Sequence, residues 1–208
     1  KADSEFMIKI MGDPKIIYDG VDGINNYFDI ISDKIIDYVQ LIPTKDDFPD
    51  GYDIEDIISD IETKGNLYDI LTSLKRKKKI NKIGIEIRDE KELMHISSNS
   101  LFSFIVCDMS IMRRVISTDA AIKHLNECKL KLFAIRPLAC GWLTNRYSKL
   151  SDFPEDDNRI EWYYPGEKYR MEVDSVLYGN DIEQISIRYL NSKAYINGII
   201  IGISSYQD

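Results

Sequence analysis

The spacing of apolar residues predicts helices in the first two-thirds of the chain. In residues 24–42, apolar side chains recur at steps of three and four, which is the period of a helix with a wide buried face. Residues 54–61 and 66–74 repeat this pattern with isoleucine and leucine. A further helix is expected at residues 118–128, where a hydroxyl side chain precedes the apolar positions as a cap.

Shorter apolar runs between these helices predict strands. Residues 7–11 and 15–18 are expected to form two short strands, or one strand that is broken at residues 12–14. Isoleucine falls on every second residue in 83–87, which is typical of a half-buried strand. Residues 101–107 form a nearly continuous apolar run that suits a central strand, and 130–135 predict another strand.

The last third of the chain favours an antiparallel β-meander. Turn residues separate four runs that we interpret as strands, at 159–164, 168–178, 182–190 and 194–204. Because helices dominate early and strands late, the sequence predicts the α+β fold class.

Residues 1–6 precede a methionine, Met7, and we interpret them as a remnant of an expression vector. Residues 7–208 are expected to form a single domain, because a chain of 208 residues can bury one sizeable core. The acidic, proline-containing stretch 152–158 is the best candidate for a boundary between subregions.

Composition and charge restrict the function only moderately. The chain is 44% hydrophobic and carries a net charge of −8, which argues against general nucleic-acid binding because phosphate contacts need a basic face. The same charge suits a basic protein partner. We expect no membrane-spanning segment and no signal peptide. Three cysteines without metal-ligand spacing predict reduced thiols and a cytoplasmic location.

Cys140 is the strongest catalytic candidate, since it is followed by glycine and tryptophan as in some thiol nucleophiles. A thiol nucleophile needs a base within hydrogen-bond reach, and the two histidines of the chain are His95 and His124. Nothing in the sequence brings either one to Cys140. The segment is better explained by a buried thiol beside a packed indole.

Acidic and aromatic side chains form the candidate partner-binding surface. It comprises Asp46, Asp47, Asp50, Asp53, Glu55, Asp56, Trp162 and Tyr164. The acidic residues do not fall into the register of a calcium-binding loop, so no metal site is expected.

Two groups of cations leave alternatives open. The basic run 75–79 can contact a nucleic acid or can complement the dipole of the preceding helix. Arg113, Arg114 and Arg136 can clamp a phosphate or a carboxylate, or they can be ordinary surface charges.

The sequence contains no phosphate-binding loop, dinucleotide fingerprint, zinc motif or nucleophile elbow, so we expect no cofactor. It favours a non-catalytic protein-binding module, such as an acidic inhibitor, an immunity-type protein or a viral accessory protein, over an enzyme. Two alternatives stay open: an enzyme with Cys140 as nucleophile, and a subunit of a nucleic-acid-processing assembly that uses residues 75–79.

Overall fold

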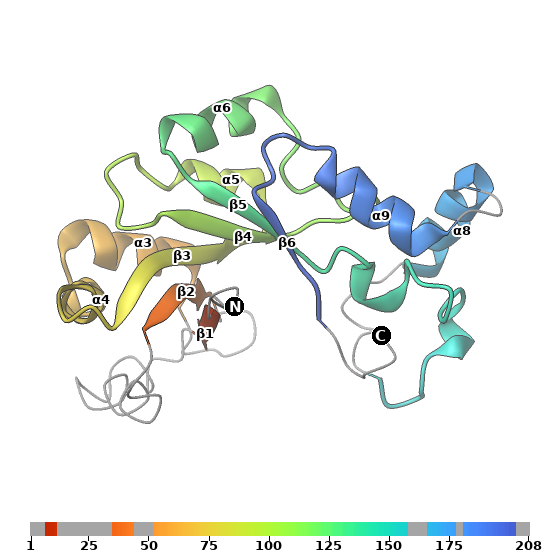
Figure 1. Cartoon of the computed structure of the whole chain (residues 1–208), viewed down its shortest axis with the longest axis horizontal. Helices are drawn as coiled ribbons and strands as arrows, with labels where there is room; N and C mark the ends of the chain where they lie inside the picture. The colour runs from red at the N-terminus through yellow and green to blue at the C-terminus, as the bar shows by residue number, and fades with distance from the viewer. Residues whose placement is uncertain (1–6, 12–34, 44–51, 158–165, 178–180, 203–208) are drawn as a thin grey trace, which may run out of the picture. The chain divides into compact units, whose positions relative to one another are not determined.

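The fold is taken from a computed structural model. It describes residues 7–11, 35–43, 52–157, 166–177 and 181–202, and the structural statements below concern these residues (Figure 1).

The chain divides into two compact units, and each is discontinuous in sequence. Unit 1 comprises residues 1–106 and 118–131, and unit 2 comprises residues 107–117 and 132–208. The predicted single domain and its subregion boundary at 152–158 stay predictions.

Six strands form one sheet in the order in which they occur along the chain (Figure 1). They are β1 (Met7–Met11), β2 (Ile36–Ile42), β3 (Ile80–Ile87), β4 (Phe104–Asp108), β5 (Lys131–Ile135) and β6 (Gly198–Ile200). The pairs β1–β2, β2–β3 and β5–β6 are parallel. Parallel neighbours need long crossover connections, and described helices lie in the connections from β2 to β3 and from β5 to β6. The sheet is therefore that of an α/β fold.

In unit 1, helices cover one face of the sheet. They are α3 (Ile54–Thr63), α4 (Asn66–Arg76), α5 (Glu90–Met94) and α6 (Asp119–Glu127). The Asp53 side chain accepts a hydrogen bond from the Asp56 backbone and begins α3 with a reciprocal capping box. Isoleucines of α3 and leucines of α4 are buried, as are Ile83 and Ile85 of β3. Apolar packing therefore holds these layers together.

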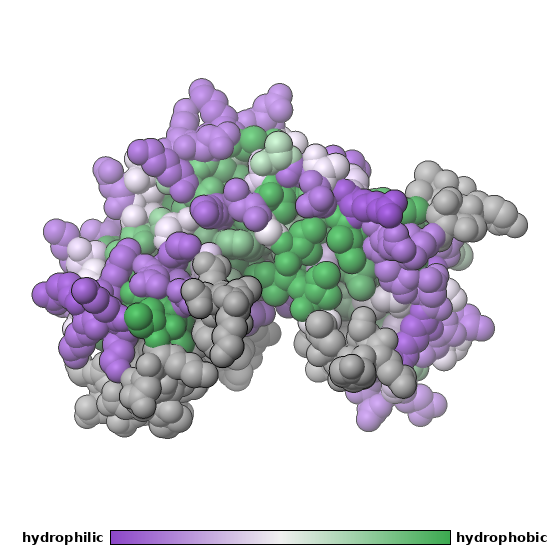
Figure 2. Space-filling model, viewed as in Figure 1, coloured by the Kyte–Doolittle hydropathy of each residue, from purple (hydrophilic) through white to green (hydrophobic). Residues whose placement is uncertain are grey.

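The described residues of unit 2 form two longer helices and two single-turn 3-10 helices. They are α8 (Gly166–Leu177), α9 (Ile182–Asn191), η1 (Ala139–Gly141) and η2 (Leu150–Asp152). A separate apolar cluster forms the core of this unit, and its buried members are Ala139, Trp142, Leu143, Tyr147, Phe153 and Ile182. Figure 2 shows hydrophobic residues reaching the surface at β6, and Ile201 just beyond that strand is 43% exposed.

The helix predicted at residues 24–42 is wrong in its described part, because Ile36–Ile42 is strand β2. Five of its residues, including Val39, Gln40 and Leu41, are buried. A strand that is buried on both faces has a nearly continuous apolar run, and such a run also fits helical steps. The rest of the predicted helix that precedes residue 35, like the strand predicted at 15–18, lies outside the described residues.

The α+β class and its antiparallel meander are also wrong. Two of the four predicted strands are the helices α8 and α9, and the Asp181 side chain caps α9. Only Gly198–Ile200 is a strand in the fourth segment, and it pairs parallel to β5. The segment predicted at 159–164 lies outside the described residues. The strand pairs printed for the described sheet are parallel, so it is not an antiparallel meander.

The remaining elements are confirmed to within a few residues. These are the helices predicted at 54–61, 66–74 and 118–128 and the strands predicted at 7–11, 83–87, 101–107 and 130–135. Among the described helices, none has the length and apolar character needed to cross a membrane.

Candidate functional site

The carboxyl ends of β4 and β5 bring one carboxylate and two guanidinium groups together in unit 2. Asp108 is the last residue of β4, and Arg136 directly follows β5. An Nη1 atom of Arg113 lies 3.5 Å from Asp108 Oδ2, and one of Arg136 lies 3.6 Å from the same oxygen. We call these three residues the arginine site. Ligands of open α/β sheets bind outside the carboxyl ends of the strands, so this position is suited to binding.

The charges of the arginine site are unevenly exposed. The Asp108 side chain is 9% exposed, whereas those of Arg113 and Arg136 are 43% and 38% exposed. Both guanidinium groups therefore reach solvent beside a buried carboxylate. Guanidinium groups bind phosphates and carboxylates through paired hydrogen bonds, so the arrangement can hold an anionic group.

A tight turn after β4 positions Arg113. Ser110 is fully buried, and its Oγ accepts hydrogen bonds from the backbone N–H groups of Met112 and Arg113 at 3.2 and 3.1 Å. The Ser110 N–H in turn donates to the Arg113 carbonyl at 2.8 Å. The turn is closed on both sides, so the backbone of Arg113 is fixed close to Asp108.

Four of the six residues that follow β5 have positive φ angles. The φ angles of Arg136, Ala139 and Cys140 are 53°, 48° and 55°, and Gly141 follows at 105°. Residues other than glycine disfavour this region, and such strain clusters at functional sites. Ser186 of α9 is fully buried and donates to the Pro137 carbonyl at 2.6 Å, which fixes the segment next to Arg136.

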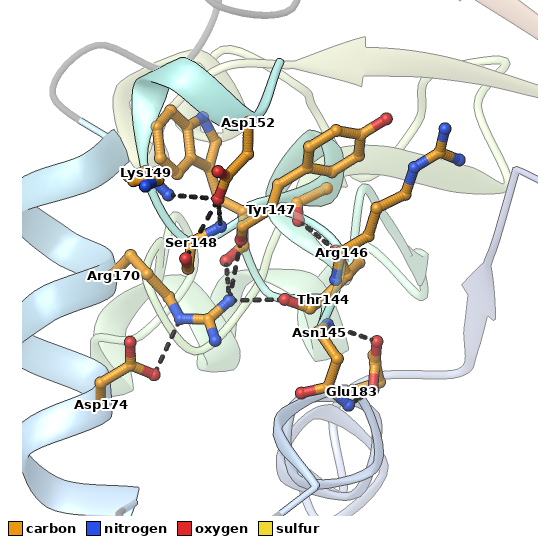
Figure 3. A network of polar contacts seen from close by, with 12 residues as sticks. Thr144, Asn145, Arg146, Tyr147, Ser148, Lys149, Asp152, Arg170, Asp174 and Glu183 are labelled. Atoms are coloured by element: carbon orange, nitrogen blue, oxygen red, sulfur yellow. Dashed lines mark hydrogen bonds and ion pairs between the residues drawn. The ribbon is translucent and has the colours of Figure 1, made fainter.

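Charged side chains from two helices hold the loop that follows, residues 142–147. The buried Arg170 of α8 donates from Nη1 to the carbonyls of Trp142, Thr144 and Tyr147 at 2.8, 2.6 and 3.0 Å (Figure 3). Its Nε lies 2.8 Å from Asp174 on the same helix. A buried guanidinium that serves three carbonyls fixes the path of the loop.

Glu183 of α9 holds the same loop from a second direction (Figure 3). Its carboxylate accepts hydrogen bonds from the Asn145 backbone N–H at 2.7 Å and from the Asn145 side chain at 2.8 Å. Loop 142–147 is therefore tied to both helices of unit 2.

Polar side chains gather on one side of the β2–β3 pair in unit 1, where the buried ring of Phe104 also packs against Tyr38. Paired residues of parallel strands point to the same side, and the register pairs Lys9 with Gln40 and Tyr38 with Lys82. Lys82 Nζ lies 2.9 Å from the Tyr38 hydroxyl, and Gln40 Nε2 lies 2.6 Å from a Glu86 carboxylate oxygen. We call Lys9, Tyr38, Gln40, Lys82 and Glu86 the polar face.

The cysteine and histidine candidates lie in different units. Cys140 belongs to unit 2, beside its apolar cluster. His124 is in unit 1, with Nε2 2.9 Å from the Ile96 carbonyl and 3.5 Å from Cys128 Sγ. Burial, and then the charge of Glu127, raise the pKa of Cys128, which keeps that thiol protonated. The contacts of His124 are therefore those of a structural residue.

His95 and the described acidic candidates lie around the start of α3. His95 Nδ1 is 3.9 Å from Glu55 at an exposed position. Asp53 and Asp56 cap α3. The other five candidates lie outside the described residues. They are Asp46, Asp47, Asp50, Trp162 and Tyr164.

The basic candidates separate into two kinds. Lys75 and Arg76 end α4 and complement its dipole. Arg113 and Arg136 belong to the arginine site. Arg114, the third arginine predicted to bind an anion, forms a backbone β-bridge with Met109. Within the described residues, no group of three or more acidic, cysteine or histidine side chains is arranged to hold a metal ion.

Sequence reasoning missed Asp108 and the polar face. Asp108 ends an apolar run, and a carboxylate at the end of a buried strand is a signal that could have been used. Gln40 and Glu86 become neighbours only through the pairing of β2 with β3.

No protein-family model and no curated protein sequence matches the chain. Solved structures do match. The holo form of the aldo-keto reductase AKR11C1 from Bacillus halodurans is 19% identical, with a TM-score of 0.64 over 97% of this chain and 62% of that one. Its apo form is 18% identical, with a TM-score of 0.60 over 96% and 60%. The glycerol dehydrogenase AKR11B4 from Gluconobacter oxydans is 17% identical, with a TM-score of 0.60 over 88% and 55%.

The chain therefore shares its fold with part of the TIM-like barrel of aldo-keto reductases, and it spans about three fifths of the length of these structures. These matches contradict the predicted non-catalytic binding module, together with its description as an inhibitor, immunity or viral protein. In TIM barrels, active sites lie at the carboxyl ends of the strands, where the arginine site is found.

Proposed function

We propose that this chain belongs to an oxidoreductase that interconverts a carbonyl compound and the corresponding alcohol. The observation that carries the proposal is the parallel sheet with strands in chain order, which aligns with an aldo-keto reductase over 97% of the chain. The arginine site supports it, because it lies at the strand ends where barrel enzymes bind their ligands.

Reduction of a carbonyl needs a hydride donor, and a nicotinamide dinucleotide supplies the hydride when it is bound. The charge and exposure of two residues fit such a cofactor, because the partly exposed guanidinium groups of Arg113 and Arg136 can contact a phosphate. In the proposal these two residues hold the cofactor's phosphate. Asp108 orients both guanidinium groups, and Ser110 and Ser186 fix the backbone segments that carry them.

The proposal is tested with the purified chain, with NADPH and NADH as probes and a panel of aldehydes and ketones as substrates. Dinucleotide binding is followed by isothermal titration calorimetry, and turnover by the loss of the reduced cofactor's absorbance. We expect one dinucleotide to bind and at least one carbonyl compound to be reduced.

Arginine variants test whether the arginine site binds the cofactor. Arg113→Gln and Arg136→Gln should each weaken dinucleotide binding about tenfold, since a charge-assisted hydrogen bond is worth about 1.5 kcal/mol at such exposed positions. The matched control is Arg188→Gln at an exposed arginine of α9 that donates to Gln184. Absence of both dinucleotide binding and turnover in the unmodified chain would refute the proposal. Equal losses in all three variants would refute the role of the arginine site.

We also propose a cytoplasmic location. The chain has three cysteines, an odd number without metal-ligand spacing, which suits reduced thiols in a reducing compartment. Mass spectrometry of the thiols after rapid alkylation of cells tests this, and a disulfide in the freshly extracted protein would contradict it.

A further inference from the structure

A pocket of about 380 Å³ lies in unit 1, between the junction of α3 with α4 and the loop 97–101. This volume is within the range of about 300–1,000 Å³ that is usual for small-molecule sites. Of its apolar lining residues, Ile61 is 3% exposed and Leu101 is half-buried, whereas the charged residues Glu62 and Lys64 are exposed. The pocket therefore has a covered apolar part and a charged part that is open to solvent.

Internal hydrogen bonds fix both walls of this pocket. At the junction of the helices, the Lys64 backbone N–H donates to the Asp60 carbonyl. The Asp60 carboxylate accepts from the Tyr68 backbone N–H at 3.1 Å. In the opposite wall, the Ser100 N–H donates to the Ser97 carbonyl at 3.1 Å. Because both walls are held by the chain itself, a ligand that enters the pocket has little backbone to order.

The polar side chains that line the pocket are not engaged by the protein. Within the described residues, five of them have no hydrogen bond or ion pair through their side chains. They are Glu62, Lys64, Tyr68, Ser97 and Asn99. Glu62 and Lys64 are separated only by Thr63 and do not pair with each other. Both of their charges can therefore meet a ligand.

The two helix ends beside the pocket have opposite polarity. Glu62 lies in the last turn of α3, where the helix carbonyls already concentrate negative charge. Lys64 lies just before α4, whose first turn is the positive end of that helix. A cationic group is thus favoured on the side of Glu62 and an anionic group on the side of Lys64. The ligand that fits both carries the two charges close together.

We propose that this pocket binds a free α-amino acid with an aliphatic side chain. Its ammonium group meets Glu62 and its carboxylate meets Lys64, while its side chain lies against the apolar part of the pocket. The Tyr68 hydroxyl and the Asn99 amide both donate and accept, so they can contact either end of the ligand.

This site goes beyond the proposed function, because it lies in unit 1 and includes no residue of the arginine site. A chain that binds leucine but neither binds a dinucleotide nor reduces a carbonyl compound refutes the proposed function alone. The reverse result refutes the amino-acid site alone.

The experiment titrates the full chain with L-leucine and follows the amide NMR signals of residues 97–101. Three control ligands each lack one part of leucine: 4-methylpentanoate lacks the ammonium group, 3-methylbutylamine lacks the carboxylate, and glycine lacks the aliphatic side chain. We expect leucine to bind and each singly charged control to bind about fivefold more weakly, as suits the loss of one exposed ion pair. Glycine should also bind more weakly than leucine, because it buries no aliphatic surface. No response to leucine, or equal affinity for leucine and any of the controls, overturns the proposal.

The variant Lys64→Met tests the contact with the carboxylate, since it keeps an aliphatic side chain and removes the charge. Leucine affinity should fall about fivefold, and leucine should lose its advantage over 3-methylbutylamine but keep that over 4-methylpentanoate. The matched control is Lys129→Met, at an exposed lysine of unit 1 with a similar φ angle, 54° against 58°, outside the pocket. If Lys64→Met binds leucine as tightly as Lys129→Met does, the proposal fails.

A second variant, Glu62→Gln, retains the shape of the side chain and removes the opposite charge. Leucine should now lose its advantage over 4-methylpentanoate and keep that over 3-methylbutylamine. A merely structural role of either residue would weaken all ligands together and would not produce these opposite changes in selectivity. An unchanged order of affinities in Glu62→Gln also overturns the proposal.

Discussion

The two units are stabilised by different kinds of interaction. In unit 1, apolar faces of α3 and α4 pack on β2 and β3, and residues such as Leu71 and Ile83 have no exposed surface. In unit 2, a strained segment after β5 is held by charged and polar side chains, chiefly Arg170, Glu183 and Ser186. The apolar contacts are non-directional, whereas the polar ones specify the path of individual backbone atoms.

This difference indicates which part of the protein depends on a precisely fixed backbone. The backbone at Arg136, Ala139 and Cys140 lies in a disfavoured conformation and persists only because surrounding contacts determine it. Hydrogen bonds from buried donors are suited to that purpose, since leaving them unmade is costly. The comparison therefore predicts that core substitutions in unit 1 affect stability most, while substitutions in unit 2 affect the loops beside the arginine site.

The largest effect is expected for Leu71→Ala in α4. Leu71 has no exposed surface, and removal of such a side chain leaves a cavity that costs about 3 kcal/mol. Urea unfolding measures the loss, and amide hydrogen exchange locates it. Amides of β3 should lose protection while those of loop 142–147 keep theirs. An equal loss of protection in that loop would show that the two units do not differ as proposed.

A smaller and more local effect is expected for Arg170→Met. The substitution keeps an aliphatic side chain but leaves three carbonyls and Asp174 without their donor, at a cost of about 2 kcal/mol. Hydrogen exchange should become faster in loop 142–147, and dinucleotide affinity should fall because the segment at Arg136 is less well fixed.

The matched control is Arg188→Met, since this exposed arginine donates to Gln184 on its own helix. It should change neither exchange in the loop nor affinity. Unaltered exchange in Arg170→Met would mean that the hydrogen bonds to the three carbonyls do not determine the path of the loop.

The same contrast explains what could be predicted from the sequence. The helices α3 and α4 were predicted because their buried residues recur at the helical period after suitable caps, which is local information. Strand β2 was not predicted, because a strand that is buried on both faces lacks the alternation of apolar and polar residues that identifies a strand. In α9, isoleucines such as Ile182 gave a strand-like pattern, although the cap at Asp181 was available as a signal.

The arginine site depends on information that is not local. Arg113 and Arg136 attracted notice as anion-binding residues, but their common carboxylate, Asp108, becomes visible only once β4 and β5 are neighbours. The polar face depends in the same way on the register of β2 with β3, which places Gln40 beside Gly84 and near Glu86. Strand order and register follow from the packing of the whole sheet.

The smallest effect concerns the pH dependence of the loop next to residues 142–147. The pKa of Asp152 is lowered, chiefly because its carboxylate accepts a hydrogen bond from the Ser148 backbone N–H (Figure 3). Partial desolvation acts in the opposite direction, and a hydrogen bond from the Lys149 backbone N–H lowers the pKa further. A lowered pKa means that the folded chain favours the ionised form. This contribution to stability is complete above the usual aspartate pKa of about 3.9 and is lost as the pH falls through the lower folded-state pKa.

Asp152→Asn should therefore be less stable than the unmodified chain at pH 6, and the difference should shrink as the pH is lowered towards 3. Urea unfolding at several pH values measures it, with Asp156→Asn at a nearby exposed carboxylate as the control. Because the carboxylate interacts only with the turn at 148–152 in the contacts described, hydrogen exchange in β3 should not respond. A difference that stays constant across this range would mean that the shape of the side chain, and not its charge, holds the turn in unit 2.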